Sequence, residues 1–125
     1  MPLTVEINQA TRTVYSRFTG AINESEVHAV VSHLAQRPDF DPTFSHIIDF
    51  SAVTIANVST GFIKVLAQEK PLFDRDAKQI VVAPQSHIFA MARMAQILRE
   101  RQLPNIQVVR SLQEACVILG IERAG

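Results

Sequence analysis

The sequence lacks a charge imbalance, a cysteine pair and a long apolar run, and each shortage excludes a class of protein. Twelve basic and twelve acidic side chains give a formal net charge of zero, so charge indicates neither nucleic-acid binding nor attraction to an anionic membrane. The single cysteine, Cys116, cannot form a disulfide within the chain, and no signal-peptide pattern follows Met1. We therefore expect a cytoplasmic protein.

No apolar run approaches the ~20 residues of a membrane span, because Asp49, Gln85 and Arg93 interrupt the longest ones. In contrast, hydrophobic residues make up 47% of the 125 residues, enough to bury the core of one ordinary domain. We expect a single soluble domain over residues 1–125. A net charge near zero also permits self-association.

The first part of the chain predicts a β-hairpin followed by a helix. Apolar and polar residues alternate over residues 3–8, and a second extended run covers residues 13–19. Asn23 and Glu26 then form a capping-box pattern. It begins a helix that we expect to end at about residue 37.

Strands and helices alternate over the rest of the chain. The stretch 46–62 predicts a strand that ends near Asp49, a loop of small residues and the start of a helix. The remaining expected elements are strands at 80–83 and 106–109, and helices at about 58–72, 86–101 and 112–119, the last ended by a left-handed cap at Gly120. This order predicts an α/β fold, with a five-stranded, mainly parallel mixed sheet and four helices.

Three of the helices carry apolar stripes that we expect to be buried. The stripes consist of Val27, Val30, Val31 and Leu34 in the first helix, Ile88, Met91, Ala92, Ala95 and Leu98 in the third, and Leu112, Ala115, Cys116 and Leu119 in the last.

The candidate site lies where the strand at 46–50 gives way to a helix, because ligands and partners of α/β proteins gather at the carboxyl ends of strands. Its residues are Asp49, Asn57, Val58, Ser59, Thr60 and Gly61. Ser59 and Thr60 could bind a phosphate or a partner at the helix start, or simply cap the helix. Asp49 could act as an acid or base, or accept hydrogen bonds from the loop after it.

Residues 49–53, Asp-Phe-Ser-Ala-Val, and residues 57–61 resemble the Asp-Leu-Ser-Gly-Val and Asp-Ser-Ser-Gly motifs of the STAS domain. The resemblance, which includes the element order, covers nearly the whole chain. STAS domains include bacterial anti-sigma-factor antagonists, so it implies a regulatory, protein-binding module. Val58 stands at the position of the serine that antagonists phosphorylate. The architecture is also similar to the lipid-binding SEC14 domain, which implies a lipid or small-ligand carrier.

Other side chains suggest weaker alternatives. Ser59, His87 and Asp49 could form the nucleophile, base and orienting acid of a hydrolase, although the glycine-flanked nucleophile elbow is missing. We expect no metal site, because His28 and His33 are five residues apart and do not share a helix face. No cofactor is expected either.

Ala90, Met94 and Ile97 form an apolar flank on the helix at 86–101. The flank either packs against the final helix or binds a partner, which could be a second copy in a two-fold dimer. The reading that we favour from the sequence is a non-enzymatic regulatory module that presents residues 57–61 to a protein. The alternatives are a small-ligand or lipid carrier and a hydrolase using Ser59.

Overall fold

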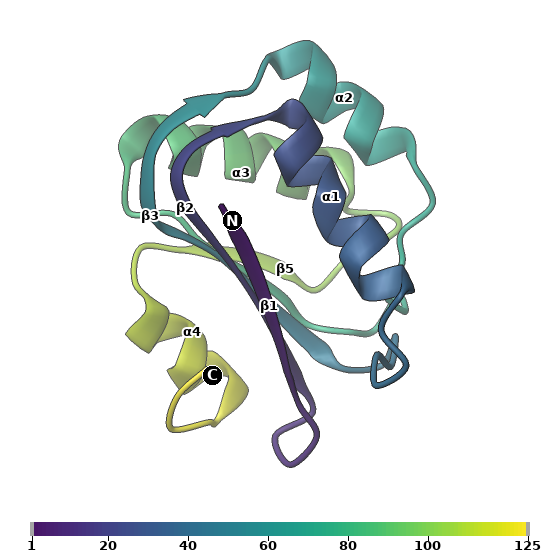
Figure 1. Cartoon of the computed structure of the whole chain (residues 1–125). Coiled ribbons are helices and arrows are strands. Elements are labelled where there is room, and N and C mark those ends of the chain that lie inside the picture. The colour runs from purple at the N-terminus through teal and green to yellow at the C-terminus, as the bar shows by residue number, and fades with distance from the viewer. Residues whose placement is uncertain (1, 125) are drawn as a thin grey trace.

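The structure is a computed structural model that describes residues 2–124, and it has the predicted α/β architecture (Figure 1). A five-stranded sheet has the order β1-β2-β3-β4-β5, in which β1 and β2 are antiparallel and the later pairs are parallel. The elements are β1 (Leu3–Asn8), β2 (Thr13–Asn23), α1 (Glu24–Ala35), β3 (Ser45–Asn57), α2 (Thr60–Gln68), β4 (Gln79–Val82), α3 (Ser86–Leu98), β5 (Ile106–Val109) and α4 (Leu112–Leu119).

The helices divide unequally between the two faces of the sheet. Figure 1 shows α1, α2 and α3 on one face, and α4 with the C-terminal segment on the other. Phe18 and Ile88 belong to the core beneath the three helices, whereas Ile47 and Ala115 belong to the core beneath α4. Neighbouring residues of one strand face opposite layers, so the central strand β3 contributes Ile48 to the first core and Ile47 to the second.

The predicted loop after Asp49 is wrong, because residues 51–57 continue β3. They pair with residues 19–23 of β2, which is also longer than predicted. β4 pairs with β3 only as far as Asp49, so the long β2–β3 ribbon curves beyond the rest of the sheet (Figure 1). Gly20 has a φ of 74°, and two shifts in register flank it. Such irregularities increase the bend and twist of a strand pair.

The helices begin close to their predicted positions, but three end earlier. Asn23 and Glu26 form the expected capping box of α1, and Gly120 ends α4 with a φ of 68°. α2 runs from Thr60 to Gln68 and not over 58–72, because the residue before Pro71 is disfavoured in a helix. α1 ends at Ala35 and α3 at Leu98, two and three residues earlier than expected. No helix within residues 2–124 is long and apolar enough to cross a membrane.

The apolar stripes of α1 and α3 are buried less completely than predicted. Val31 is 37% exposed and Leu98 is 45% exposed, whereas Leu34 and Ile88 are buried as expected. The inward positions of α3 include the small residues Ala92 and Ala95, which do not fill the space between this helix and its neighbours. The three-helix layer therefore encloses a cavity.

Candidate functional site

Residues 57–61 form the turn from β3 into α2, and Ser59 is the N-cap of the helix. Its Oγ accepts a hydrogen bond from the N–H of Phe62 at 3.1 Å. The Ser59 N–H in turn donates to a carboxylate oxygen of Glu24 at 2.8 Å. The hydroxyl and the N–H of Ser59 therefore have partners within the chain. The Glu24 carboxylate already lies at this helix start, and its negative charge repels a bound phosphate or other anion.

The other predicted residues of this turn differ in exposure. Thr60 and Gly61 are exposed at the first turn of α2, and Asn57 is exposed at the end of β3. Val58 is partly buried and lines the cavity beneath the helices. The capping role of Ser59 is shown, and the partner- or phosphate-binding role of residues 57–61 stays a prediction.

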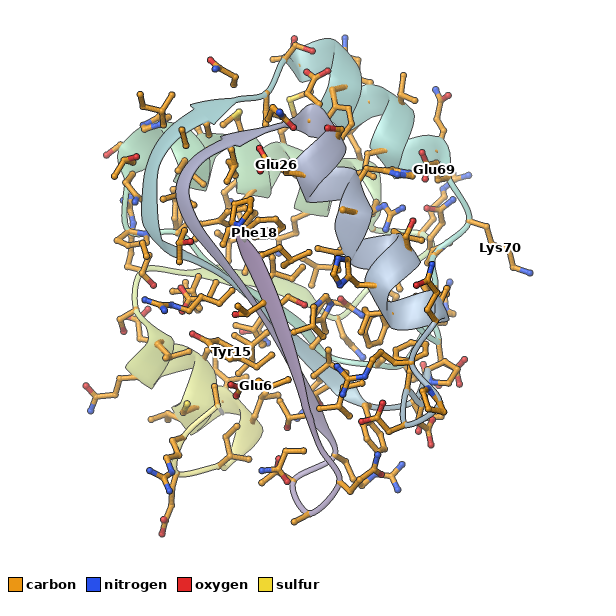
Figure 2. The ribbon with its side chains drawn as sticks, in the orientation of Figure 1. Glu6, Tyr15, Phe18, Glu26, Glu69 and Lys70 are labelled. Carbon is orange, nitrogen blue, oxygen red and sulfur yellow. The ribbon has the colours of Figure 1, made fainter. Side chains whose placement is uncertain are left out.

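Asp49 lies inside β3, not at its end, and its side chain is buried. It accepts a 2.5 Å hydrogen bond from the Tyr15 hydroxyl and further bonds from the N–H and hydroxyl of Ser51. Burial, followed by the bond to Asp49, raises the pKa of Tyr15. Tyr15 lies on the side of the sheet that faces α4 (Figure 2), so Asp49 is separated by the sheet from the three-helix layer.

The three residues of the hydrolase hypothesis are not brought together. Asp49 bonds Tyr15 and Ser51 beneath α4, and the Ser59 hydroxyl caps α2 in the other layer. His87 is exposed in the first turn of α3. Among residues 2–124 no hydrogen bond joins any two of Ser59, His87 and Asp49, so the structure offers this mechanism no support.

The histidines and the cysteine have separate environments. No group of three or more metal-binding side chains is found in the part of the chain that the structure describes. His28 contacts Glu69 at 2.9 Å, and His33 is exposed. Cys116 is a buried residue of α4, and burial raises the pKa of its thiol.

Ala90, Met94 and Ile97 lie on the outer side of α3. Ala90 is exposed, Met94 is partly buried and Ile97 is 62% exposed. The alternative in which they pack against the final helix is wrong, because α4 covers the opposite face of the sheet (Figure 1). The flank is open to solvent in this chain, as a partner-binding surface requires.

A cavity of about 230 Å³ lies between the sheet and helices α1, α2 and α3. Most of its lining is aliphatic or aromatic, and representative wall residues are Val27, Val30, Phe50, Ile63, Leu66 and Met91. The opening is marked by lining residues that reach solvent: Val31 on α1 and Lys70 after α2 are exposed, and Glu69 is partly exposed. Figure 2 shows Lys70 pointing outward from this edge.

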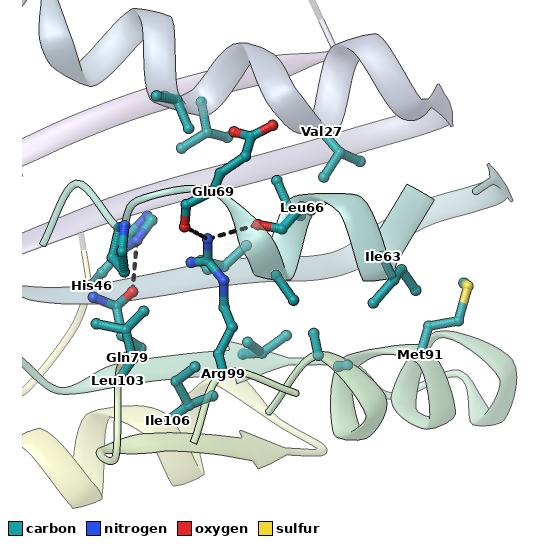
Figure 3. Close-up of a pocket in the computed structure, with 18 of the residues that line it drawn as sticks. Val27, His46, Ile63, Leu66, Glu69, Gln79, Met91, Arg99, Leu103 and Ile106 are labelled. Carbon is teal, nitrogen blue, oxygen red and sulfur yellow. Dashed lines mark hydrogen bonds between the residues drawn. The ribbon is translucent and has the colours of Figure 1, made fainter. Parts of the chain in front are cut away.

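One end of the cavity is polar. Figure 3 shows His46, Gln79, Glu69 and Arg99 at this end, and Ile63 and Met91 at the other. The ring of His46 stacks on Phe73 with 4.7 Å between centroids, and burial lowers the pKa of His46 to about 4. The imidazole is thus neutral at pH 7.

The neutral histidine belongs to a buried hydrogen-bonded chain. His46 Nε2 lies 2.8 Å from Ser16 Oγ, and its Nδ1 lies 3.2 Å from Gln79 Oε1. Because a neutral imidazole has one donor and one acceptor, the Nδ1–H donates to the Gln79 carbonyl and Nε2 accepts from the serine hydroxyl. The amide nitrogen of Gln79, Nε2, is buried without a partner.

Sequence reasoning missed this cavity and its polar end. His46 and Gln79 are polar residues at the starts of two apolar strands, and Arg99 follows the last turn of α3. A polar side chain at the start of an otherwise apolar, buried strand indicates a buried polar group that needs a partner, and this signal was present in the sequence. No local pattern signals that these three residues, which lie about 20 to 50 positions apart in the sequence, come together.

No protein-family model matches this chain, and no curated protein is detectably similar to it in sequence. The resemblance to STAS domains therefore stays a prediction. The structure shows an α/β architecture with a helix-covered cavity.

Proposed function

We propose that the protein is a non-enzymatic binding module that holds one small amphipathic molecule beneath α1, α2 and α3. The observation that carries this proposal is the cavity of about 230 Å³, with apolar walls and a few polar groups at one end. Binding sites for small molecules have this composition: the apolar lining supplies affinity, and a few polar groups fix orientation. The resemblance to the lipid-binding SEC14 domain, which stays a prediction from the sequence, implies a binding function of the same kind.

The volume limits the size of the ligand. An engineered apolar cavity of ~150 Å³ binds benzene, and pockets for drug-sized molecules span ~300–1,000 Å³. The cavity lies between the two. Scaled from the benzene-binding cavity, it holds about nine non-hydrogen atoms, which suits an eight-carbon chain better than a two-chain lipid.

The opening has the features of a ligand entrance. α1 packs mainly on β1 and β2, and α2 packs mainly on α3, so the edges of α1 and α2 face each other across the cavity. The contact between His28 and Glu69 bridges this edge. Both side chains are more than 40% exposed, and screening by solvent makes such a bridge weak. A small ligand can therefore pass here without disrupting a buried interface.

The test combines an unbiased search with a blocked cavity. Native mass spectrometry of protein purified from its own host should show a bound molecule of low mass. In a titration followed by amide NMR shifts, octan-1-ol should bind the wild type and shift residues of the three-helix layer. Ala92→Phe places a ring in the cavity and should abolish binding, because Ala92 lines it.

Ala90→Phe is the matched control, since Ala90 lies on the exposed side of the same helix. It should leave octan-1-ol binding unchanged. If the wild type binds no eight-carbon probe and purifies without a bound molecule, the proposal is wrong.

The second candidate is the regulatory module expected from the sequence: a bacterial, cytoplasmic protein that presents residues 57–61 to a protein partner. Two exposed apolar residues flank this turn, Ile55 on β3 at 56% exposure and Val65 on α2 at 59%. Apolar residues beside exposed polar ones are common in protein-binding surfaces. Replacing Ser59 and Thr60 by alanine should cost about 0.5–2 kcal/mol of stability through the lost cap and should weaken capture of a partner. Unchanged capture would leave the turn with a capping role alone.

A further inference from the structure

Arg99 projects from the end of α3 into the polar end of the cavity (Figure 3). Its Nη2 group donates to the carbonyl oxygens of Leu66 and Glu69, at 2.8 and 3.2 Å. These bonds hold the guanidinium in place at the C-terminal end of α2. Its Nε–H is buried without a partner, and Nη1 makes no hydrogen bond within residues 2–124. The side chain is thus fixed by one nitrogen and keeps donors for another molecule.

Arg99 forms no salt bridge with an acidic side chain of residues 2–124, although the charge of Glu69 favours its protonated form. Of the residues that the structure describes, none places a carboxylate oxygen within 4.0 Å of this guanidinium. The carboxylate of Glu69 contacts His28 instead. Burial lowers the pKa of Arg99, but arginine remains protonated in proteins. A partly buried cation without a counter-ion is costly, and an anion in the cavity would remove that cost.

The second free donor at this end belongs to Gln79. Its carbonyl is occupied by His46, which leaves the buried amide nitrogen unpaired. Gln79 and Arg99 both adjoin the segment between α3 and β5, because Gln79 N–H donates to the carbonyl of Asn105 and Leu103 N–H donates to that of Arg99. Among the described cavity-lining residues, the unpaired buried polar atoms are therefore donors. A ligand head group made of acceptors complements them.

We propose that the molecule bound in this cavity is a monocarboxylic acid of about eight carbons, and that Arg99 holds its carboxylate. The inference rests on the proposed function and adds the chemical class of the ligand. One guanidinium matches one negative charge, and arginine to carboxylate is among the stronger charge-assisted hydrogen bonds. The tail then lies along the apolar walls toward Met91 and Ile63.

The first test uses the wild-type chain and needs no variant. Octanoate and octan-1-ol have the same number of carbons and differ in the charged head group. At pH 7.5, isothermal titration should give octanoate at least a tenfold lower Kd, because hydrogen bonds to a charged group contribute more than neutral ones. Equal binding of the two probes would refute the carboxylate site while leaving the ligand-binding function intact. Binding of neither would refute both.

Three variants locate the head group. Arg99→Met should weaken the binding of octanoate about tenfold or more and leave the binding of octan-1-ol unchanged. Arg93→Met removes the same charge from an exposed position of the same helix, and it should change neither affinity. Lys70→Met tests the exposed cation at the opening. A larger loss of octanoate binding in Lys70→Met than in Arg99→Met would overturn the assignment to Arg99.

Octyl phosphate tests the choice of anion. It should bind the wild type more weakly than octanoate, since a second charge would have no second buried cation beside Arg99. If octyl phosphate binds more tightly than octanoate and this binding depends on Arg99, the ligand is a phosphate ester and not a carboxylic acid. Circular dichroism of Arg99→Met checks that the variant folds, and if it does not, the comparison of octanoate with octan-1-ol on the wild type still decides the proposal.

Discussion

His46 should make the stability of this protein fall steeply on mild acidification. Burial lowers its pKa to about 4 in the folded state, whereas an unfolded chain has a histidine pKa near ~6.5. Between these values the unfolded state binds a proton that the folded state does not, so the free energy of unfolding decreases as pH falls. Stability is lost from about pH 6.5 downward, and the loss levels off below about pH 4.

The size of the effect follows from the two pKa values. Each unit of pKa difference corresponds to ~1.4 kcal/mol, so the shift from 6.5 to about 4 is worth about 3 kcal/mol in full. Between pH 8 and pH 5, where the folded state is still largely unprotonated, the loss is about 2 kcal/mol. This is a large fraction of the ~5–15 kcal/mol that stabilises a typical domain.

The assay is urea unfolding followed by circular dichroism at pH 8, 7, 6 and 5, on the wild type and His46→Gln. The variant is less stable at pH 8 if glutamine leaves Ser16 or Gln79 unpaired, but the test is the slope with pH. His46→Gln should lack the histidine part of the slope. His33→Gln, which changes an exposed histidine of α1, should retain it. Equal slopes in the wild type and His46→Gln would refute a neutral, buried His46.

Three further perturbations test other parts of the structure. Ala92→Phe should increase the free energy of unfolding by about 1–2 kcal/mol, because burying a phenyl ring in a cavity is favourable, and the midpoint of urea unfolding should rise accordingly. A decrease of about 1–3 kcal/mol would show that the site is already packed. Tyr15→Phe removes the hydroxyl that bonds the buried Asp49, and should cost about 1.5–3 kcal/mol in the same assay. Replacing Met94 and Ile97 together by glutamate should leave the domain folded by circular dichroism, because Ile97 is 62% exposed and surface changes cost ~0.5 kcal/mol. In sedimentation, the wild type should be a two-fold dimer that this pair of changes dissociates; a wild type that stays monomeric at high micromolar concentration would contradict the dimer.

The sequence by itself determined the order of elements and most of the helix starts. Asn23 and Glu26 cap α1 as their spacing predicts, and Ser59 and Ser111 cap α2 and α4. Gly120 adopts the left-handed conformation that ends α4. These features are decided by groups three or four residues apart, so a local pattern is sufficient to find them. The alternation of strands and helices then limits the sheet to parallel crossovers after the first hairpin.

Tertiary structure decided the length of β3 and the place of the candidate site. Residues 51–57 are small and polar enough to suggest a loop, but pairing with residues 19–23 of β2 satisfies their backbone groups and makes them a strand. Asp49 is therefore held in the α4 layer and not at the end of a strand. Pairing across about 30 positions of sequence leaves no local pattern to detect.

The cavity and its polar end also depend on contacts between distant elements. His46, Gln79 and Arg99 come from β3, β4 and the end of α3, and only the packing of helices on the sheet brings them to one place. The sequence marked Ala92 and Ala95 as part of an apolar stripe, which predicts burial but not the space left beside a small side chain. That space depends on the positions of three helices relative to the sheet, because a void is a property of all the surfaces around it.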